Sequence, residues 1–497
     1  MPTSELFDYE PVRRSRRSTV EELATGHESW KPISRKISDS PPEELVSEKW
    51  PTESKATHEA DKAKAAQRIE NYSLLKHGHG LSFLGLFLFT LLVYLRPYEL
   101  FPSLSWLSKS AFWVALSTLV IFVPTQLGLE NRLTIRTKEV NTVLLFALTG
   151  LLSIPFALDP SRAFDAFLEY LKVILMFVIM VNVVRTNKRL MTLVVLIMLI
   201  SCGLSVGAFY DYIIGNLALR GQRIAGAVGG LFSNPNDLAL HLVTFIPIGI
   251  ALVLSTRSSI KKLLFLLASA LMVTGIVATF SRGGFIGLAA VILFLAWKLA
   301  GRHRIFVFAG GVFLITALFF VAPSDYRSRL ATTNDDSATV RIDDLKRSVF
   351  VAIRHPLLGV GMDNYILYSN SNHATHNAYT QVAAELGLPA LAIYLFLLFG
   401  TIKNLKKVET DSASARKHEP FYYLSIGMQA SLIGFMVSSF FASVAYLWYL
   451  YYLIGYAVCV TRLFGAREQT QSDNQMTPVT PIKIFPNAEK YEPQATH

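Results

Sequence analysis

Two segments of this sequence place arginine side chains next to glycine, and the first of them also places two asparagines beside a proline. Arg220 and Arg223 stand before Asn234, Pro235 and Asn236 in a glycine-rich stretch. A guanidinium group beside glycine-rich backbone is typical of an anion site, because it donates two parallel hydrogen bonds to a phosphate or carboxylate. Asn-Pro-Asn also favours a turn followed by a helix start. Asn234 and Asn236 are therefore candidates for ligand contact, and helix capping is the alternative interpretation.

The second segment is Ser281-Arg282-Gly283-Gly284, between two long apolar runs with almost no connector. A charge at that position costs about 3 kcal/mol unless it is paired or reaches water. Snorkelling to water is the simple interpretation of Arg282. Adjacent glycines, however, let a ligand approach the backbone closely. We therefore predict that Arg282 binds an anion.

The imidazole of His376 is the best candidate for a general base. It stands between Thr375 and Asn377 at an expected helix start, with His373 shortly before it. A neutral imidazole, with a pKa near 6.5, can accept the proton of a hydroxyl group that attacks an electrophile. A lone histidine more often only makes hydrogen bonds, but one displayed with arginines on the same face is a stronger candidate. Asn377 beside it is a candidate for substrate contact.

Residues 338–354 are expected to form an amphipathic helix near the same site. Apolar residues recur there at helical spacing, which predicts a face that lies on the membrane domain. They are Ile342, Leu345, Val349 and Ile353, and the cations on the wetter sides are Arg341, Lys346, Arg347 and Arg354. Of these cations, Arg341 is a candidate substrate ligand.

The elements that must position these residues are membrane-spanning helices. Hydrophobic residues make up 52% of the 497 and charged residues only 17%, whereas soluble domains carry about 25% charge. This composition excludes a soluble enzyme, a disulfide scaffold and a nucleic-acid binder. Twelve apolar runs are long enough to cross about 30 Å of hydrocarbon. They span 81–95, 111–127, 141–157, 163–184, 190–212, 237–255, 263–280, 284–299, 305–322, 388–402, 421–442 and 445–461.

The Lys and Arg content of the connections predicts the orientation. Five loops on one side carry 17 of these residues and the short loops on the other side carry six, and cytoplasmic loops collect positive charge. Both termini are therefore expected in the cytoplasm. The predicted organisation is a disordered cytoplasmic tail (1–79), nine spans (80–322), an outer loop with amphipathic helices (323–387), three spans (388–463) and a cytoplasmic tail (464–497).

Four motifs occur in a fixed order and fall on the predicted outer face. They are Asn234-Pro235-Asn236-Asp237-Leu238-Ala239, Ser281-Arg282-Gly283-Gly284, His355-Pro356-Leu357-Leu358-Gly359-Val360-Gly361 and Thr375-His376-Asn377-Ala378-Tyr379. Each motif alone is weak. Together, over roughly residues 220–400, they resemble those of the bacterial O-antigen ligase and O-antigen polymerase superfamily.

The resemblance implies an all-α membrane glycosyltransferase fold of the C type, with one large periplasmic loop. It also implies inverting, metal-independent transfer of a glycan from an undecaprenyl diphosphate carrier at the periplasmic face of the bacterial inner membrane. The acceptor would be a lipid A core or another carrier-bound glycan. Carried over by motif, Arg282 and His376 would be functional, with Arg223 or Arg220 as the upstream arginine. No cofactor and no nucleic-acid partner are expected, and the acidic pairs at 335–336 and 343–344 are expected to solvate the loop rather than hold a metal ion.

Two alternatives stay open. A secondary transporter or lipid flippase is supported by Asp165, Glu169 and Lys172, which share one helix face in the fourth span, because charges within a membrane often mark a substrate path. A simple ion pair between Glu169 and Lys172 explains the same spacing. The other alternative keeps the chemistry but transfers the glycan to a protein Ser or Thr, as a protein O-oligosaccharyltransferase would.

Overall fold

The computed structural model describes residues 75, 77–100, 102–216, 224, 232, 234–299, 304–321, 336–369, 373–413 and 419–476. Within these ranges the regular elements are all helices. Eleven helices there are long and apolar enough to cross a membrane. The prediction of a polytopic all-α membrane protein is therefore confirmed. The predicted tails lie outside these ranges except for their inner ends, where the first span already begins at His77 and the last helix continues to Met476.

The membrane helices follow the apolar runs closely. The first eight are His77–Glu99, α3 (Ser110–Glu130), α4 (Lys138–Ser153), α5 (Pro160–Val183), α6 (Asn187–Ile213), α7 (Pro235–Ser255), α8 (Ser259–Ala278) and α9 (Arg282–Leu299). The last three are α14 (Leu388–Asp411), α15 (Pro420–Ser438) and α16 (Trp448–Met476). The expected span 305–322 is occupied by α10 (Arg304–Val321), whose sequence from Ile305 to Val321 carries no charged residue.

Short helices connect these spans. They are α2 (Pro97–Leu100), η2 (Pro102–Lys109), η3 (Ile154–Phe156), η6 (Tyr365–Leu367) and η8 (Ser439–Phe441). The expected outer loop contains α12 (Asp336–Arg354) and α13 (Ala378–Leu386). Local sequence sets many of the helix starts. The side chain of Asp159, for example, accepts a hydrogen bond from the Arg162 backbone, and Pro160 occupies the first helical position, where no backbone donor is needed.

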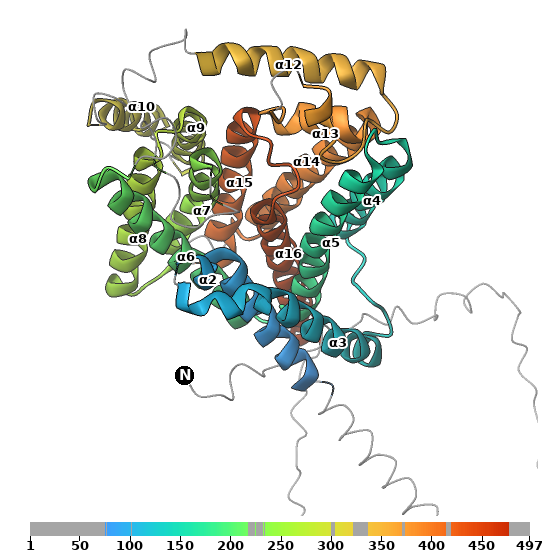
Figure 1. Ribbon diagram of the computed structural model, residues 1–497. Coiled ribbons are helices and arrows are strands. Elements are labelled where there is room, and N and C mark those ends of the chain that lie inside the picture. The colour runs from blue at the N-terminus through green and yellow to red at the C-terminus, as the bar shows by residue number, and fades with distance from the viewer. Residues whose placement is uncertain are drawn as a thin grey trace, which may run out of the picture.

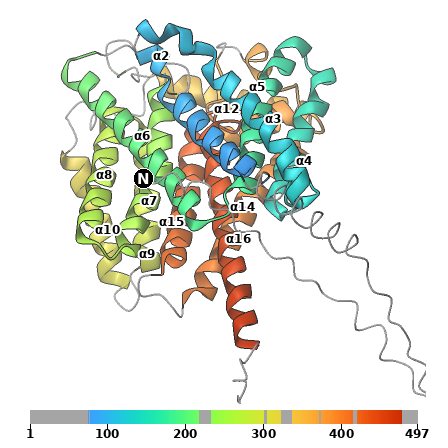
Figure 2. The same cartoon turned by 90° about the horizontal axis from the view of Figure 1, so that it is seen from below.

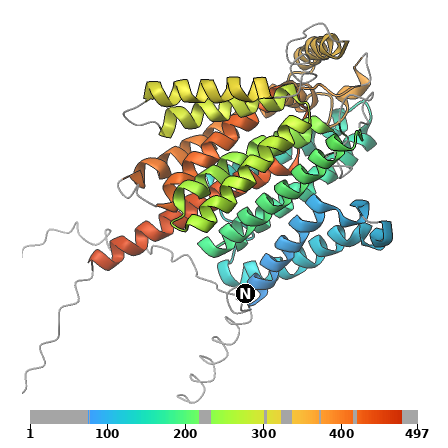
Figure 3. The ribbon, with the colours of Figure 1, turned by 90° about the vertical axis from the view of Figure 1, so that its left-hand side faces the viewer.

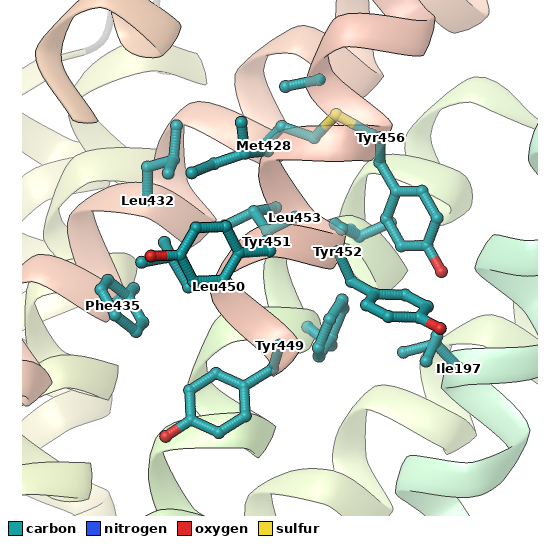
Figure 4. Packing of buried hydrophobic residues seen from close by; sticks show 14 of the residues in the cluster. Ile197, Met428, Leu432, Phe435, Tyr449, Leu450, Tyr451, Tyr452, Leu453 and Tyr456 are labelled. Carbon is teal, nitrogen blue, oxygen red and sulfur yellow. The ribbon is translucent and has the colours of Figure 1, made fainter. Parts of the chain in front are cut away.

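The centre of the bundle is built from α7, α15 and α16. Residues 449–456 of α16 are almost wholly buried, and Figure 4 shows their tyrosine rings among Leu432, Phe435 and Ile197. A buried tyrosine packs through its ring and places its hydroxyl on a polar partner, as Tyr451 does on the Ala445 carbonyl. Gly434 lets α15 pack closely against α7 and α9, because a Cβ there would lie 2.6 Å from the side chain of Val291 in α9.

The helices form two groups on either side of α14, α15 and α16. Helices α6 to α10 lie on one side and α3 to α5 on the other (Figures 1 and 2). Helix α12 crosses one end of the bundle, and Figure 3 shows it end-on while the spans run along the picture. Its axis is therefore roughly perpendicular to theirs. We call this end the α12 face and the other end, beyond which α16 extends, the opposite face.

The orientation predicted for the amphipathic helix is wrong. Helix α12 forms over the expected residues, but Ile342, Val349 and Ile353 are exposed. The face directed at the rest of the protein instead contains Asp344 and Ser348, together with Val351 and Ala352. Buried polar groups need hydrogen-bond partners, and the following loop supplies them: Ser369 donates to the Asp344 carboxylate and Tyr365 to the Asp344 carbonyl. These distant partners decide which face is buried, and helical spacing does not reveal them.

Candidate functional site

The Asn-Pro-Asn and Ser-Arg-Gly-Gly motifs meet on the α12 face. Asn234 caps α7, because its side-chain oxygen accepts a hydrogen bond from the Asn236 backbone at 3.0 Å. The Ser281 hydroxyl donates to Asn236 Oδ1 at 2.9 Å, and its oxygen accepts from the Gly284 backbone at 3.2 Å. Asn234 is therefore a helix cap, and Asn236 joins the start of α7 to the start of α9.

Arg282 is the first residue of α9 and is half-buried. Phe280, two residues before it, has a φ of 53°, which makes the sharp turn from α8 into α9. The start of a helix carries a partial positive charge, so an arginine is electrostatically unfavourable there. The backbone N–H groups at this helix start and the guanidinium of Arg282 would both attract an anion. The position of Arg282 is thus suited to an anionic ligand.

The glycines that follow Arg282 serve helix packing. A Cβ on Gly284 would lie 2.7 Å from the Ala239 Cβ of α7, and one on Gly283 would lie 2.9 Å from the Phe441 Cβ of η8. Neighbouring helices therefore occupy the space beside these two residues. Helix packing therefore explains both glycines, and the case for Arg282 rests on its guanidinium and its position at the helix start.

Asn377 is a structural residue at the start of α13. It is buried, and its Oδ1 accepts hydrogen bonds from the Tyr379 and Thr380 backbones at 2.9 and 3.0 Å. Its Nδ2 donates to the Phe440 carbonyl at 3.2 Å. Both polar atoms of the amide are thus used by the fold. The structure favours a capping role for Asn377 over the predicted substrate contact.

His376, immediately before this cap, is held in a strained backbone conformation. Its φ is 52°, in the left-handed region that residues with a Cβ rarely adopt. Strain of this kind persists only where the surroundings enforce it, and it clusters at functional sites. Asn377 supplies the enforcement, together with Thr375, whose hydroxyl donates to the Asn377 carbonyl at 2.9 Å. The imidazole is half-buried on the α12 face.

The environment of His376 favours the neutral imidazole. Burial lowers its pKa, and the positive charge of Arg341 lowers it further, whereas the Asp344 carboxylate opposes the shift and His373 adds to it. The His373 ring lies with its centroid 6.1 Å from that of His376. A neutral imidazole is the form that accepts a proton. The predicted base is therefore in the protonation state that the chemistry needs.

Arg341 and Asp344 reach His376 from the inward face of α12. Arg341 is half-buried and Asp344 is buried, with Oδ1 accepting from the Ser369 hydroxyl at 3.1 Å. The two residues are three apart and so share one side of the helix. Arg341 is one of the residues predicted from the sequence to bind substrate, whereas Asp344 is expected there only to solvate the loop. The separation of three residues already indicates, from the sequence, that Asp344 lies on the same side of the helix as Arg341.

The His-Pro-Leu-Leu-Gly-Val-Gly motif shapes the chain between α12 and α13. The backbone N–H groups of Val360 and Gly361 donate to the Ala384 and Glu385 carbonyls at 3.0 and 2.8 Å. Gly359 has a φ of 64°, and a Cβ there would overlap the Glu385 carbonyl. This motif is therefore a scaffold that fixes α12 against α13.

Helix α15 and η8 connect the arginine motif to the histidine motif. The Ser438 hydroxyl donates to the Gly283 carbonyl at 3.2 Å, and the Phe440 carbonyl accepts from Asn377. The Arg282 and His376 segments are thus fixed to the same end of α15, although 94 positions separate them in the sequence. Arg220 and Arg223, the predicted upstream arginines, lie outside the described residues.

Other expectations concern metal ions and transport. Among the described residues, no group of three His, Cys, Asp or Glu side chains is arranged to hold a metal ion. Asp343 lies 3.9 Å from Lys346. Glu169 and Lys172 form an ion pair at 2.5 Å and both are exposed on α5. The simple ion-pair interpretation therefore accounts for Glu169 and Lys172, two of the three charges that had supported a transporter. Asp165, the third, is exposed near the start of α5.

These features define a polytopic helical membrane protein with a cationic, imidazole-containing site at one end. A family model, described as O-antigen ligase, matches residues 267–395, which include Arg282, Arg341 and His376. The match supports membership of the O-antigen ligase and polymerase superfamily and glycan transfer of that general type. A comparison with curated proteins gave no match.

Proposed function

We propose that this protein transfers a glycan from an undecaprenyl diphosphate carrier to an acceptor hydroxyl at the periplasmic face of the bacterial inner membrane. The observation that carries the proposal is His376, strained, half-buried and flanked by Arg341 and Asp344 within the segment that the O-antigen ligase model matches. The excess of Lys and Arg in the loops of the opposite face supports cytoplasmic termini, with the α12 face outside.

The proposed reaction is a direct displacement. The acceptor hydroxyl gives its proton to the His376 imidazole as its oxygen attacks the anomeric carbon. The bond from that carbon to the carrier phosphate breaks, and its electron pair leaves with the diphosphate. Attack from the side opposite the leaving group inverts the anomeric configuration. Arg282 and one of Arg220 or Arg223 would stabilise the charge that develops on the diphosphate, because fixed cations act most strongly in a site that partly excludes water.

Within this proposal Arg341 and Asp344 position the base. Arg341 favours the neutral imidazole before the reaction, and the Asp344 carboxylate favours the imidazolium that forms during it. The Ser369 and Tyr365 hydrogen bonds fix Asp344 while this happens. Arg341 is also a candidate contact for the substrate diphosphate or glycan.

Reconstitution in proteoliposomes tests the function. The purified protein is supplied with an undecaprenyl diphosphate-linked glycan and, separately, with a lipid A core, a second carrier-linked glycan or a Ser/Thr-containing protein. A product with inverted anomeric configuration, formed with one acceptor and in the presence of EDTA, is the expected result. Activity that EDTA removes and a divalent cation restores would contradict metal independence, and movement of intact donor across the bilayer without product would favour a flippase.

A further inference from the structure

Helix α12 has an exposed apolar stripe that no described element covers. Ile342, Val349 and Ile353 are 53%, 43% and 68% exposed. They are seven and four residues apart, so they fall on one side of the helix. Leu357, in the turn that follows, is 73% exposed. Exposed apolar side chains thus run along one side of α12, and another follows just beyond its end.

This stripe continues the apolar surface of a membrane span. The Leu388 backbone donates to the Pro356 carbonyl at 2.7 Å, which ties the turn after α12 to the first residue of α14. Leu388 is exposed, and Phe396 and Phe399 are exposed further along the same helix. Because α14 is long and apolar enough to span a membrane, its exposed aromatic residues face lipid. Leu357 therefore lies at the level where lipid begins.

Cationic side chains border the stripe. The Arg354 and Arg347 guanidinium groups lie 4.6 and 5.5 Å from the centroid of the Phe350 ring. Lys346 is exposed. A helix with a basic side and an exposed apolar side is typical of segments that lie in a membrane interface, with the apolar side chains at the acyl boundary and the cations at the phosphate groups. If this side of α12 faced only water, the apolar side chains would stay exposed to it, which is unfavourable.

We propose that α12 lies in the outer boundary of the membrane on the α12 face, with phospholipid as the occupant of its apolar stripe. Ile342, Val349 and Ile353 contact acyl chains near the headgroups, and Lys346 and Arg354 contact lipid phosphates. The axis of α12 runs across the ends of the spans, which is the direction that an interfacial helix requires (Figure 3). The inward side of the same helix carries Arg341 and Asp344, so lipid contact fixes the height of both residues above the bundle.

Fluorescence quenching tests this contact without any assay of activity. Single cysteines are introduced into a variant with Cys202 and Cys459 replaced by Ala, labelled with bimane and placed in nanodiscs of phosphatidylcholine and phosphatidylglycerol brominated near the headgroup end of the acyl chain. The test variant is Ile353→Cys. Phe399→Cys, within α14, is the positive control for membrane insertion. Asp343→Cys, on the flank of the same helix and 71% exposed, is the matched control.

We expect strong quenching at position 399, quenching of at least half the emission at 353, and clearly less at 343. If 399 is quenched but 353 is not, the stripe faces water or another protein and the proposal is wrong. Equal quenching at 353 and 343 would also overturn it, because the helix would then have no preferred lipid side. Since the readout is lipid contact, its failure would leave the proposed glycan transfer unaffected.

Discussion

The two ends of the bundle place positive charge differently. On the opposite face, three arginines cap the last turn of α5: Arg185 donates to the Asn182 carbonyl at 2.7 Å, Arg189 to the Val183 carbonyl at 2.9 Å, and Arg462 to the Val181 carbonyl. Cations are favourable at the end of a helix, where the backbone carbonyls carry partial negative charge. These arginines therefore stabilise the fold.

Carboxylates complete the pattern on the opposite face. Glu130 accepts from Arg185 at 2.6 Å, and Glu409 of α14 accepts from Lys298 of α9 at 2.7 Å. Gln429 of α15 donates to the same Glu409 carboxylate at 2.8 Å. The ion pairs on this face therefore connect neighbouring helices and stabilise their packing.

On the α12 face, Arg162 pairs with Asp363 at 2.8 Å and Arg347 donates to the Tyr368 carbonyl at 2.9 Å, so cations also stabilise the fold at this end. The two turns next to Arg282 and His376, however, are shaped by neutral groups. Asn234, Asn236 and Ser281 shape the start of α9, and Thr375 and Asn377 shape the start of α13. Arg282 stands at the start of a helix, where its charge is unfavourable. The cations of the opposite face thus stabilise helix ends, whereas Arg282 occupies a helix start, a position that favours a bound anion.

The largest effect is expected for His376→Ala. Loss of a general base lowers the rate of transfer by about 10² to 10⁴-fold, while donor binding, measured by retention of carrier-linked glycan on the purified protein, should persist. The matched control is His355→Ala, because His355 is exposed, with its ring centroid 5.9 Å from that of Tyr368. A rate for His376→Ala equal to that of the control would make His376 a structural residue.

Arg282→Lys should reduce transfer by about 10²-fold, because lysine keeps the charge but loses the planar fork that binds two phosphate oxygens. Arg467→Lys is the control on the opposite face, since Arg467 pairs with Glu419 at 2.8 Å. We expect its turnover to stay within about twofold, because lysine keeps the positive charge beside the buried Glu419 carboxylate. Comparable losses in the two variants would remove the distinction between the faces.

The sequence predicted the membrane spans better than it predicted the roles of the residues at the site. Helix positions followed from long apolar runs, because a bilayer requires a minimum length of apolar helix. The candidates Arg282 and His376 followed from residue type and motif. The capping roles of Asn234 and Asn377, and the packing role of Gly283, depend on contacts with residues far away in the sequence.

The inward face of α12 shows the limit most clearly. Spacing marked Ile342 and Ile353 as one face but did not show which side of the helix would be covered, because Tyr365 and Ser369 stabilise Asp344 from a separate segment. The sequence therefore predicted that the helix forms and gave the wrong side. Because the wrong side of α12 was expected to be buried, the electrostatic interaction of Asp344 with His376 was not predicted.

The pH dependence of transfer sharpens the assignment of the base. The pKa of His376 is lowered, so the imidazole stays neutral to a lower pH than a free histidine, and activity should fall only as the pH drops through that lowered value. Arg341→Gln removes a charge that lowers the pKa, so the acidic limb should move to higher pH. Asp344→Asn removes a charge that raises it, so the limb should move to lower pH. Rate profiles from pH 4.5 to 8 measure both shifts, and movement in the same direction would exclude this assignment.

The smallest effect on transfer is expected from the charges of the opposite face. Glu409→Gln removes the partner of the partly buried Lys298 and should lower the free energy of unfolding by about 1–3 kcal/mol, seen as a lower midpoint of thermal unfolding in detergent. Replacing both residues by methionine should recover most of that loss, because no unpaired charge remains. Transfer at a temperature well below the midpoint should stay close to that of the unsubstituted protein in both variants. A loss of transfer without a change in the midpoint would mean that charge on this face also serves the reaction, and the contrast between the two ends would not hold.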